Sequence, residues 1–181
     1  MADTERAVFT IHIDGTKEAV WNELTKTNEP QDALWHGVLH ARGLDPGNPF
    51  QKRSRDGRTV SEVGEILEYD PPNRLKQTLR FTQYDDPYCV VTFEIADGPD
   101  GGVDFTLTVD DLTPGTKTTK GWTGSGGGDW VCKTLKEIIE DGKPSLFTRA
   151  MYRFWDIAGP LALPKKSRVE HWPMDDEKET K

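Results

Sequence analysis

A glycine-rich loop runs directly into one amphipathic helix, and this helix constrains the fold more than any other feature of the 181-residue chain. The loop spans residues 121–128, and the residues from Asp129 to Gly142 follow the 3.6-residue period of an α-helix. Gly142 is a residue at which helices typically end, and Pro144 prevents the predicted helix from continuing further. The apolar face of the predicted helix carries Trp130, Val131, Thr134, Leu135, Ile138 and Ile139. So broad an apolar face has to be buried against another layer.

The residues before this helix predict that layer, an antiparallel sheet. A first strand is expected at 6–14, then a helix at 17–25 that Thr16 can cap, then a short helical piece at 31–36. The segments with the two-residue period of half-buried strands are 59–69, 74–81, 88–95 and 103–110. A curved sheet against one long helix can enclose a cavity between the two layers. The expected fold class is therefore α+β.

Three short motifs carry a resemblance to a known family. They are Thr16-Lys17-Glu18-Ala19-Val20-Trp21, Glu68-Tyr69-Asp70-Pro71-Pro72-Asn73-Arg74-Leu75, and Gly121-Trp122 with Leu135-Lys136 and Glu140-Asp141-Gly142. With these three motifs in this order along the sequence, the chain resembles the START-like, Bet v 1-like helix-grip superfamily (SRPBCC). Within it, the chain is similar to the bacterial AHSA1-like proteins, named for homology to the activator of the Hsp90 ATPase. The resemblance implies that the sheet wraps around the long C-terminal helix and that two short helices follow the first strand.

The resemblance covers residues 5–143, which we expect to form one helix-grip domain. The chain departs from the family pattern at 108–111, where relatives often carry a histidine, and in the glycine-rich loop, which is longer than usual. Residues 144–174 form an aromatic-rich extension with a predicted short helix that ends at Gly159 and Pro160. This extension has three interpretations: a lid, a contact between two copies, or an arm packed on the sheet or the first helix. Residues 175–181 are charged and expected to be disordered.

Composition narrows the classes of partner. A net charge of -8 argues against nucleic acids and anionic membranes, which select basic surfaces. No apolar run approaches the roughly 20 residues of a membrane span, and the first residues lack the apolar core of a signal peptide. We therefore expect a cytoplasmic protein without membrane or nucleic-acid partners. Cys89 and Cys132 form no C-x-x-C pair and are expected to be reduced thiols.

The sequence contains only incomplete matches to the motifs of known catalytic and metal sites. The run Thr123-Gly124-Ser125-Gly126 lacks the leading glycine of a nucleophile elbow, and the glycine-rich loop lacks the Gly-Lys-Ser/Thr ending of a phosphate loop. That loop is interpreted as an anion site, a gate over the cavity or a plain loop whose helix is capped by Ser125 or Asp129. Asp32, His36 and His40 have the spacing of ligands on one helical face, without an evident fourth ligand. We expect no metal, no cofactor and no catalytic residue.

The main functional hypothesis is a site for a small apolar or amphipathic molecule between the sheet and the C-terminal helix. Glu65 and Gln77 interrupt the apolar strand faces, and an inward Glu65 would be a polar anchor or a proton-transfer group. A bulge in this strand would instead turn Glu65 to solvent. The residues predicted to line the site are Trp35, Val63, Glu65, Leu67, Gln77, Leu79, Phe81, Val91, Phe93, Phe105, Trp122, Trp130, Thr134 and Ile138.

Two other functions remain as alternatives to a binding protein. Some superfamily relatives are cyclases, dehydratases or hydrolases that act in the same cavity, and an enzyme of this type would need a second titratable group near Glu65. The family name instead suggests a stress-related or chaperone-associated protein interaction. A homodimer formed through the apolar extension is a further hypothesis. We expect binding without catalysis.

Overall fold

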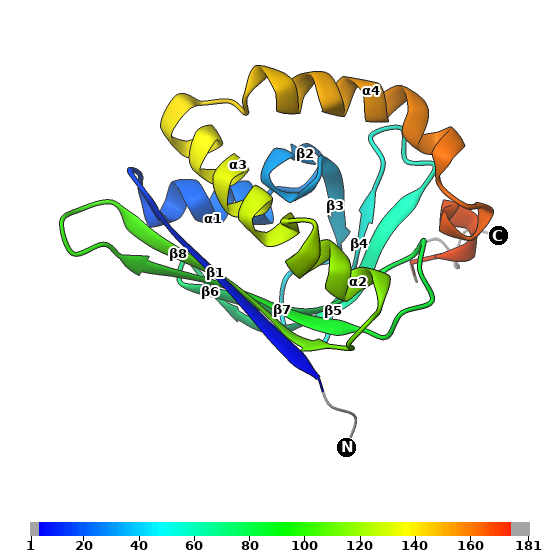
Figure 1. The fold of residues 1–181 in the computed structure, drawn as a ribbon, viewed down its shortest axis with the longest axis horizontal. Coiled ribbons are helices and arrows are strands. Elements are labelled where there is room, and N and C mark those ends of the chain that lie inside the picture. Colours follow the sequence, from blue (N-terminus) through cyan, green and yellow to red (C-terminus); the bar gives the residue numbers. More distant parts are fainter. Residues whose placement is uncertain (1–3, 175–181) are drawn as a thin grey trace.

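One antiparallel sheet of eight strands curves around helix α3 in the computed structural model, which describes residues 4–174 (Figure 1). The strand order in the sheet is β1-β8-β7-β6-β5-β4-β3-β2. The strands are β1 (Glu5–Ile13), β2 (Pro30–Gln31), β3 (Gly37–Ala41), β4 (Pro49–Arg53), β5 (Val60–Asp70), β6 (Arg74–Phe81), β7 (Cys89–Asp97) and β8 (Val103–Leu112). This architecture confirms the predicted α+β helix-grip fold. The predicted disordered tail at 175–181 lies outside the described residues.

The helical elements are short apart from α1, α3 and α4. They are α1 (Lys17–Thr25), the 3-10 turn η1 (Asp32–Leu34), α2 (Lys117–Thr119), the π-helical turn η2 (Lys120–Gly124), α3 (Gly127–Asp141), α4 (Leu146–Ala162), and the 3-10 turns η3 (Lys165–Ser167) and η4 (Val169–His171). No helix within residues 4–174 is long and apolar enough to cross a membrane.

The two long predicted helices form where their local signals place them. The Thr16 hydroxyl caps α1 by accepting a hydrogen bond from the backbone N–H of Ala19 at 3.1 Å, as predicted. Gly142 ends α3 with a φ of 73°, also as predicted. The expected caps Ser125 and Asp129 are wrong, because Gly126 occupies the N-cap without a side-chain hydrogen bond. Helix α4 runs past Gly159 and Pro160 to Ala162, so the predicted stop at these two residues is wrong.

The segment from residue 30 to residue 53 differs most from the sequence-based expectation. The predicted helical piece at 31–36 reduces to the single turn η1, because Trp35 and His36 take positive φ angles of 57° and 61°. Strands β2, β3 and β4 surround this turn and extend the sheet beyond β5. Asp32, His36 and His40 therefore do not share a helix face; His40 lies on β3, opposite Gln51 of β4.

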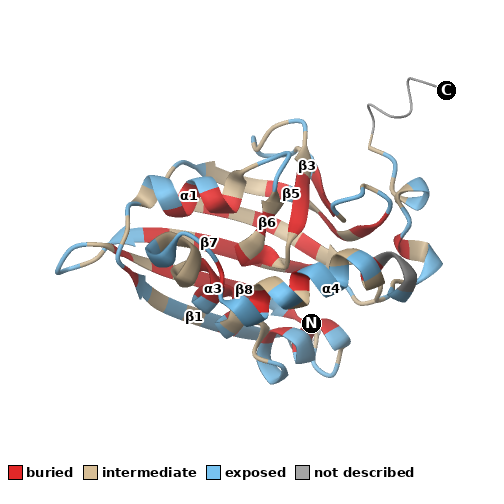
Figure 2. Ribbon diagram, turned by 90° about the horizontal axis from the view of Figure 1, so that it is seen from above, coloured by how far each residue is buried: buried red, intermediate tan, exposed pale blue. Residues whose placement is uncertain are grey.

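Apolar side chains fill the space between α3 and the middle of the sheet. Val131 and Leu135 of α3 are fully buried against the inward side chains of β7 and β8. The rings of Phe93 and Phe105 stack there with centroids 6.1 Å apart. The red strands beneath α3 in Figure 2 mark this packed centre. A cavity along the whole length of α3 is therefore absent from the described part of the chain.

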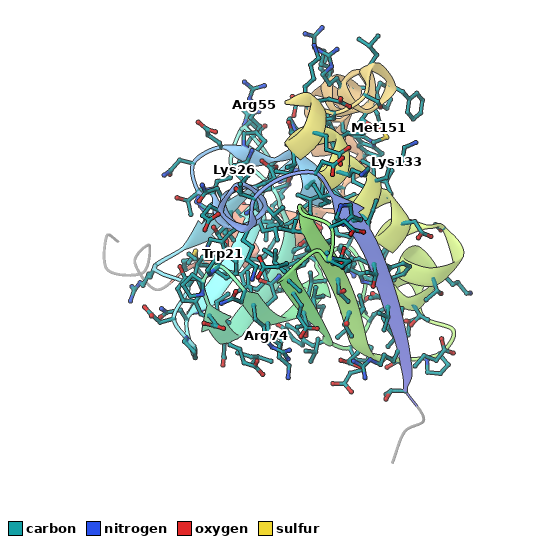
Figure 3. The ribbon with its side chains drawn as sticks, turned by 90° about the vertical axis from the view of Figure 1, so that its left-hand side faces the viewer. Trp21, Lys26, Arg55, Arg74, Lys133 and Met151 are labelled. Carbon is teal, nitrogen blue, oxygen red and sulfur yellow. The ribbon has the colours of Figure 1, made fainter. Side chains whose placement is uncertain are left out.

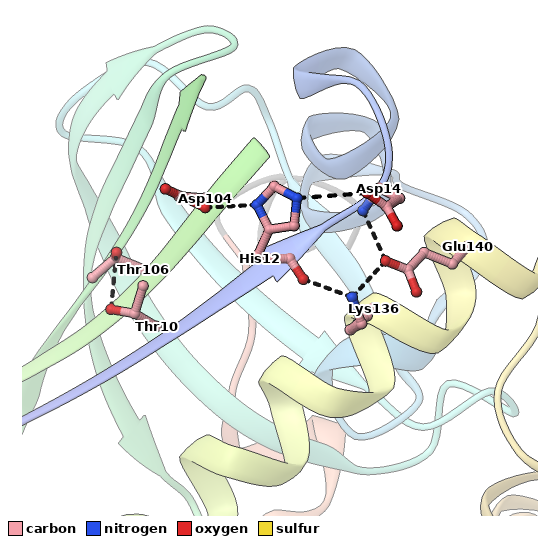
Figure 4. Close-up of polar contacts among 7 residues, drawn as sticks. All are labelled: Thr10, His12, Asp14, Asp104, Thr106, Lys136 and Glu140. Carbon is pink, nitrogen blue, oxygen red and sulfur yellow. Dashed lines mark hydrogen bonds and ion pairs between the residues drawn. The ribbon is translucent and has the colours of Figure 1, made fainter. Parts of the chain in front are cut away.

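Polar contacts close one end of the sheet–helix space (Figure 4). The Lys136 ammonium of α3 donates to the backbone carbonyl of His12 at 2.8 Å and bridges to Glu140 at 2.6 Å. Glu140 also accepts from the backbone N–H of Asp14 at 2.8 Å. On the other side of β1, the His12 imidazole contacts Asp104 of β8 at 2.8 Å. These bonds hold the C-terminal half of α3 against β1.

The network at His12 predicts a pH-dependent stability. The hydrogen bond to Asp104 raises the pKa of His12 above its usual value of 6.5. A group with a raised pKa stabilises the fold below its unfolded pKa, and this contribution is lost as the pH rises through the folded pKa. We expect His12→Gln to lower the free energy of unfolding more at about pH 5 than at about pH 8. Urea unfolding of both proteins measures the difference, and equal losses at the two pH values would contradict it.

Candidate functional site

An aromatic pocket of about 510 Å³ opens at the N-terminal end of α3, between the sheet, η2 and α4. Its walls come from η1, β5, β6, η2, α3 and α4, so segments far apart in sequence meet here. Figure 3 shows Arg55 and Met151 on the side of the molecule that carries α4, with Arg74 on the opposite side. The residues that line the pocket are Trp35, Ser61, Glu62, Phe81, Gln83, Tyr84, Lys117, Gly121, Trp122, Ser125, Gly127, Trp130, Met151, Tyr152 and Trp155.

Trp35 is the centre of the aromatic wall. Its ring packs edge-on against Trp122 and Phe81, with centroids 5.0 Å and 5.7 Å away, and lies parallel to Trp130 at 6.3 Å. Trp130 in turn meets Tyr152 of α4 at 5.9 Å. Edge-to-face and offset ring pairs at these separations are favourable beyond the area that they bury. The pocket therefore has rigid aromatic surfaces before any ligand arrives.

Two irregular turns bring these rings together. Trp35 ends η1 in the left-handed region, which points its side chain away from the path of a continuing helix. Trp122 sits on the π-helical turn η2, where the backbone N–H of Ser125 donates to the carbonyl of Lys120 at 2.8 Å. Such turns are frequent at functional sites because they displace a side chain from regular helix geometry. Trp122 is buried as a result.

One buried ion pair lies at the floor of the aromatic pocket. Lys52 of β4 and Glu62 of β5 are direct cross-strand neighbours, and both side chains point into the interior. They are only 3% and 2% exposed, and the Lys52 Nζ lies 3.6 Å from the Glu62 Oε2. This Oε2 atom has no hydrogen-bond partner among the described residues. Glu62 lines the pocket, whereas Lys52 lies behind it.

Burial shifts both groups of this pair away from their charged forms. Desolvation raises the pKa of Glu62 and lowers the pKa of Lys52, while the attraction between them acts in the opposite direction. Glu23 of α1 adds a second, weaker attraction for the Lys52 ammonium. Each partner of the pair therefore carries a desolvation cost that the attraction between them only partly offsets.

Helix α4 passes over β3 and β4 on the side of the sheet that faces α3 (Figure 1), and its residues Met151, Tyr152 and Trp155 line the aromatic pocket. The Tyr152 hydroxyl donates to the backbone carbonyl of Asp32, and the Tyr152 ring stacks on His36 with centroids 4.5 Å apart. Asp156 of α4 lies 3.5 Å from the His36 Nε2 and 3.6 Å from the Arg55 guanidinium. These contacts tie α4 to η1 and to the β4–β5 hairpin. The extension is therefore packed across the pocket.

The outer surface of α4 is apolar and exposed. Figure 2 shows pale blue along much of this helix. The large apolar side chains exposed here are Leu146, Phe147, Phe154 and Ile157, and Trp155, which lines both cavities, is also partly exposed. A patch of this kind is typical of an interaction surface.

A second, more polar cavity of about 470 Å³ adjoins the aromatic pocket. The two cavities share Trp35, Ser61 and Trp155. The remaining lining of the second cavity comes from η1, β3, the β4–β5 hairpin and α4, and includes His36, Arg55 and Asp156. An aromatic compartment beside a charged one suits an amphipathic molecule better than a purely apolar one.

Four of the predicted site residues meet in the aromatic pocket: Trp35, Phe81, Trp122 and Trp130. The other ten predicted residues line neither cavity. Leu79, Val91, Phe93, Phe105, Gln77, Thr134 and Val63 are buried, Ile138 packs against the core, and Leu67 is half-buried. For the residues of β6, β7, β8 and α3, the inward orientation leads into packed core, because α3 approaches the middle of the sheet closely. Val63 and Leu67 of β5 are not part of that core.

The orientation predicted for Glu65 is wrong. Its side chain is exposed, and its backbone N–H donates to the Thr78 hydroxyl at 2.9 Å. The pairing of β5 with β6 shifts between Ile66 and Glu68, so a bulge reverses the alternation within this strand. Val60, Glu62 and Ile66 point inward before the bulge, and Tyr69 does so after it. Glu62 is therefore the inward carboxylate of β5.

Sequence reasoning missed several lining residues besides Glu62. Tyr152 and Trp155 stand three residues apart in the extension, and that helical spacing is the signal that could have found them. Glu62 and Lys52 gave no such signal, because charged residues in alternating strands are normally assigned to the solvent face. Gln83 and Tyr84 follow β6 in a turn whose position depends on tertiary packing.

Few of the described residues could act as a catalytic nucleophile or bind a metal ion. Burial raises the pKa of Cys89 and of Cys132 to about 12, so neither thiol supplies a nucleophilic thiolate near neutral pH. Both cysteines are free, as predicted. The described residues contain no group of three or more His, Cys, Asp or Glu side chains that could hold a metal ion.

Solved structures with the same fold come from several bacteria. The MLL2253 protein of Mesorhizobium loti is 20% identical, with a TM-score of 0.61, and the match covers 76% of this chain and 98% of that one. CalU16 of Micromonospora echinospora is 21% identical, with a TM-score of 0.56 and coverages of 86% and 94%. The Aha1 dimer of Colwellia psychrerythraea is 14% identical, with a TM-score of 0.57 and coverages of 77% and 98%. No curated protein shows significant similarity to this sequence.

The motifs, the helix-grip fold and the sequence comparison agree on one family. Residues 14–140 match the sequence model described as "Activator of Hsp90 ATPase homolog 1-like protein". That match spans well over half of the chain, from the end of β1 to the last turn of α3. The chain belongs to the family of AHSA1-like proteins within the SRPBCC superfamily.

Proposed function

We propose that this domain binds a small, largely aromatic molecule in the aromatic pocket beneath α4. The family fold supports a ligand-binding or polyketide cyclase-like domain in general. The observation that carries the proposal is a pocket of about 510 Å³ with several aromatic walls and one dry carboxylate. Natural ligand sites combine mostly apolar walls with a small number of placed polar groups in the same way.

The position of α4 adds to this proposal. Tyr152, Trp155 and Met151 of α4 supply one wall of the pocket, so the extension completes the site. Helix α4 is held by the polar links from Tyr152 to Asp32 and from Asp156 to His36 and Arg55, and by the ring contacts of Tyr152 with His36 and Trp130. Breaking them opens the mouth without disturbing the packed core under α3. In this proposal α4 acts as the cover of the pocket.

Filling the pocket is expected to abolish most of the binding. The aromatic probe is naphthalene, and its dissociation constant is measured by equilibrium dialysis. Met151→Trp places a larger side chain on the pocket side of α4 and is expected to weaken binding at least about tenfold, or about 1.4 kcal/mol. Arg153→Trp is the matched control, because Arg153 lies two residues further along α4, is exposed and lines neither cavity. An equal loss in both variants, or no loss in Met151→Trp, would contradict the assignment.

A further inference from the structure

Helix α4 turns its polar side to the protein and its apolar side to solvent. Thr148 and Tyr152 are buried, and Asp156 is half-buried beside His36 and Arg55. The side chains on the opposite side form the outer stripe, which consists of Leu146, Phe147, Ala150, Phe154, Ile157 and Ala158. An amphipathic helix of a globular protein normally buries its apolar side. The outer stripe is therefore a surface that the fold itself does not use.

The spacing within the outer stripe is that of a helix that pairs with another helix. Phe147, Ala150, Phe154 and Ile157 follow one another at intervals of three, four and three residues, the spacing of a helix-pairing seam. Two copies of α4 can run antiparallel about a two-fold axis that passes level with residue 152. This arrangement places Phe154 opposite Ala150, Phe147 opposite Ile157, and Leu146 opposite Ala158 of the other copy.

We propose that the outer stripe binds a second copy of this chain, with the two α4 helices antiparallel across a two-fold axis. Each of the three contacts then occurs twice, as a closed two-fold interface requires. Two of the contacts set a large side chain against an alanine, the pairing by which facing helices interlock. The inference is independent of the proposed function, because it uses the outward side of α4. Helix α4 follows the residues 14–140 that match the family model, so this surface belongs to the extension.

The size of the outer stripe suits a dimer. Leu146 and Ile157 are each 77% exposed, and Phe147 and Phe154 are 76% and 63% exposed. An aromatic side chain buries about 150–250 Å² when it is fully covered, so the stripe offers on the order of 500 Å² per copy. Two copies bury roughly 1,000 Å² together, the area at which specific interfaces begin. We therefore expect a dissociation constant in the micromolar range.

Charges around the outer stripe argue against other occupants. Residues 175–181 carry only charged and polar side chains, so they offer no apolar cover. A net charge of -8 opposes an anionic membrane. Arg153 is exposed beside the stripe and lies near the axis in both copies, so the two guanidinium groups repel each other. Salt screens that repulsion and is expected to tighten the dimer between about 0.1 and about 1 M NaCl. Weaker self-association at high salt would contradict this arrangement.

Sedimentation velocity of the full chain at about 1–200 µM measures the self-association. Phe154→Glu is expected to raise the dissociation constant at least about a hundredfold, because each dimer loses two buried rings and gains two charges. Val8→Glu is the matched control, since Val8 is a 55% exposed apolar residue on β1, away from α4. Circular dichroism shows whether both variants fold. A monomeric wild type at about 200 µM, or an equal effect of both variants, would overturn the inference. A monomer that sediments with phosphatidylcholine vesicles would also overturn it and assign the stripe to a membrane.

Cysteine cross-linking tests the antiparallel alignment. Ala150→Cys and Phe154→Cys proteins are mixed in equal amounts, oxidised and analysed by mass spectrometry. The mixed disulfide is expected to exceed each homodimer disulfide at least about fivefold, because only that pair brings the two Cα atoms within disulfide range. The native Cys89 and Cys132 are buried and do not compete. A parallel pair would instead link Ala150→Cys to itself. That product in excess, or no disulfide at all, would overturn the alignment.

Discussion

Glu62→Met alone is expected to lower the free energy of unfolding by about 3–5 kcal/mol, because it leaves one buried charge without its partner. The reason is the Lys52 ammonium, which is 3% exposed and would lose its cross-strand partner. Glu23 lies near enough to attract Lys52, but it is already bridged to Lys26 at 2.7 Å. Urea unfolding followed by circular dichroism measures the loss.

The double variant Lys52→Met/Glu62→Met tests the cause of that loss. Burial shifts the pKa of each partner away from its charged form, so desolvation outweighs the attraction within the pair. Replacing both charges by apolar side chains is therefore expected to restore the wild-type stability, or to exceed it by about 1–4 kcal/mol. Equal destabilisation in the single and double variants would mean that the packing volume, and not the unpaired ammonium, causes the loss.

A double variant at least as stable as the wild type would show that the pair costs stability, as expected of charges kept for a functional role. The chain places this carboxylate among the residues that line its aromatic pocket. Buried charged groups that destabilise a fold are a frequent mark of functional sites.

The fold could be predicted because its strongest signals are local. The Thr16 cap, the 3.6-residue period of α3 and its stop at Gly142 each depend on residues within one or two turns. The strands β6, β7 and β8 alternate without interruption, so their inward faces follow from the sequence alone. These elements fix the sheet and the helix that it wraps around.

The candidate site could be predicted only in part, because its geometry depends on places where a strand or a helix departs from its regular pattern. The bulge in β5 is visible only in the pairing with β6, and it decides that Glu62 points inward and Glu65 outward. The left-handed Trp35 and the π-helical turn at Trp122 are also set by tertiary contacts. The predicted ligand residues along α3 assumed a hollow under the whole helix. The structure instead packs that region and leaves space only where α4 covers it.

Gly64→Ala is the second substitution with a large expected effect. A Cβ atom at this position would fall far inside van der Waals contact with the backbone carbonyl of Thr78, and 2.6 Å from the Phe50 ring. Neither can yield cheaply, since Thr78 belongs to the neighbouring strand β6 and Phe50 is buried in the core. We expect a loss of at least about 3 kcal/mol, measured by urea unfolding.

Alanine substitutions at two other glycines serve as controls for Gly64→Ala. Gly128→Ala would press only on the ring of Phe9, a half-buried side chain that can rotate, so a smaller loss is expected. Gly124→Ala meets no atom within 4 Å and should change stability by less than about 0.5 kcal/mol. If Gly64→Ala proves as harmless as Gly124→Ala, then β5 does not run this close to β6 at Thr78. The inward direction of Glu62, two residues earlier on the same strand, would then lose its structural basis.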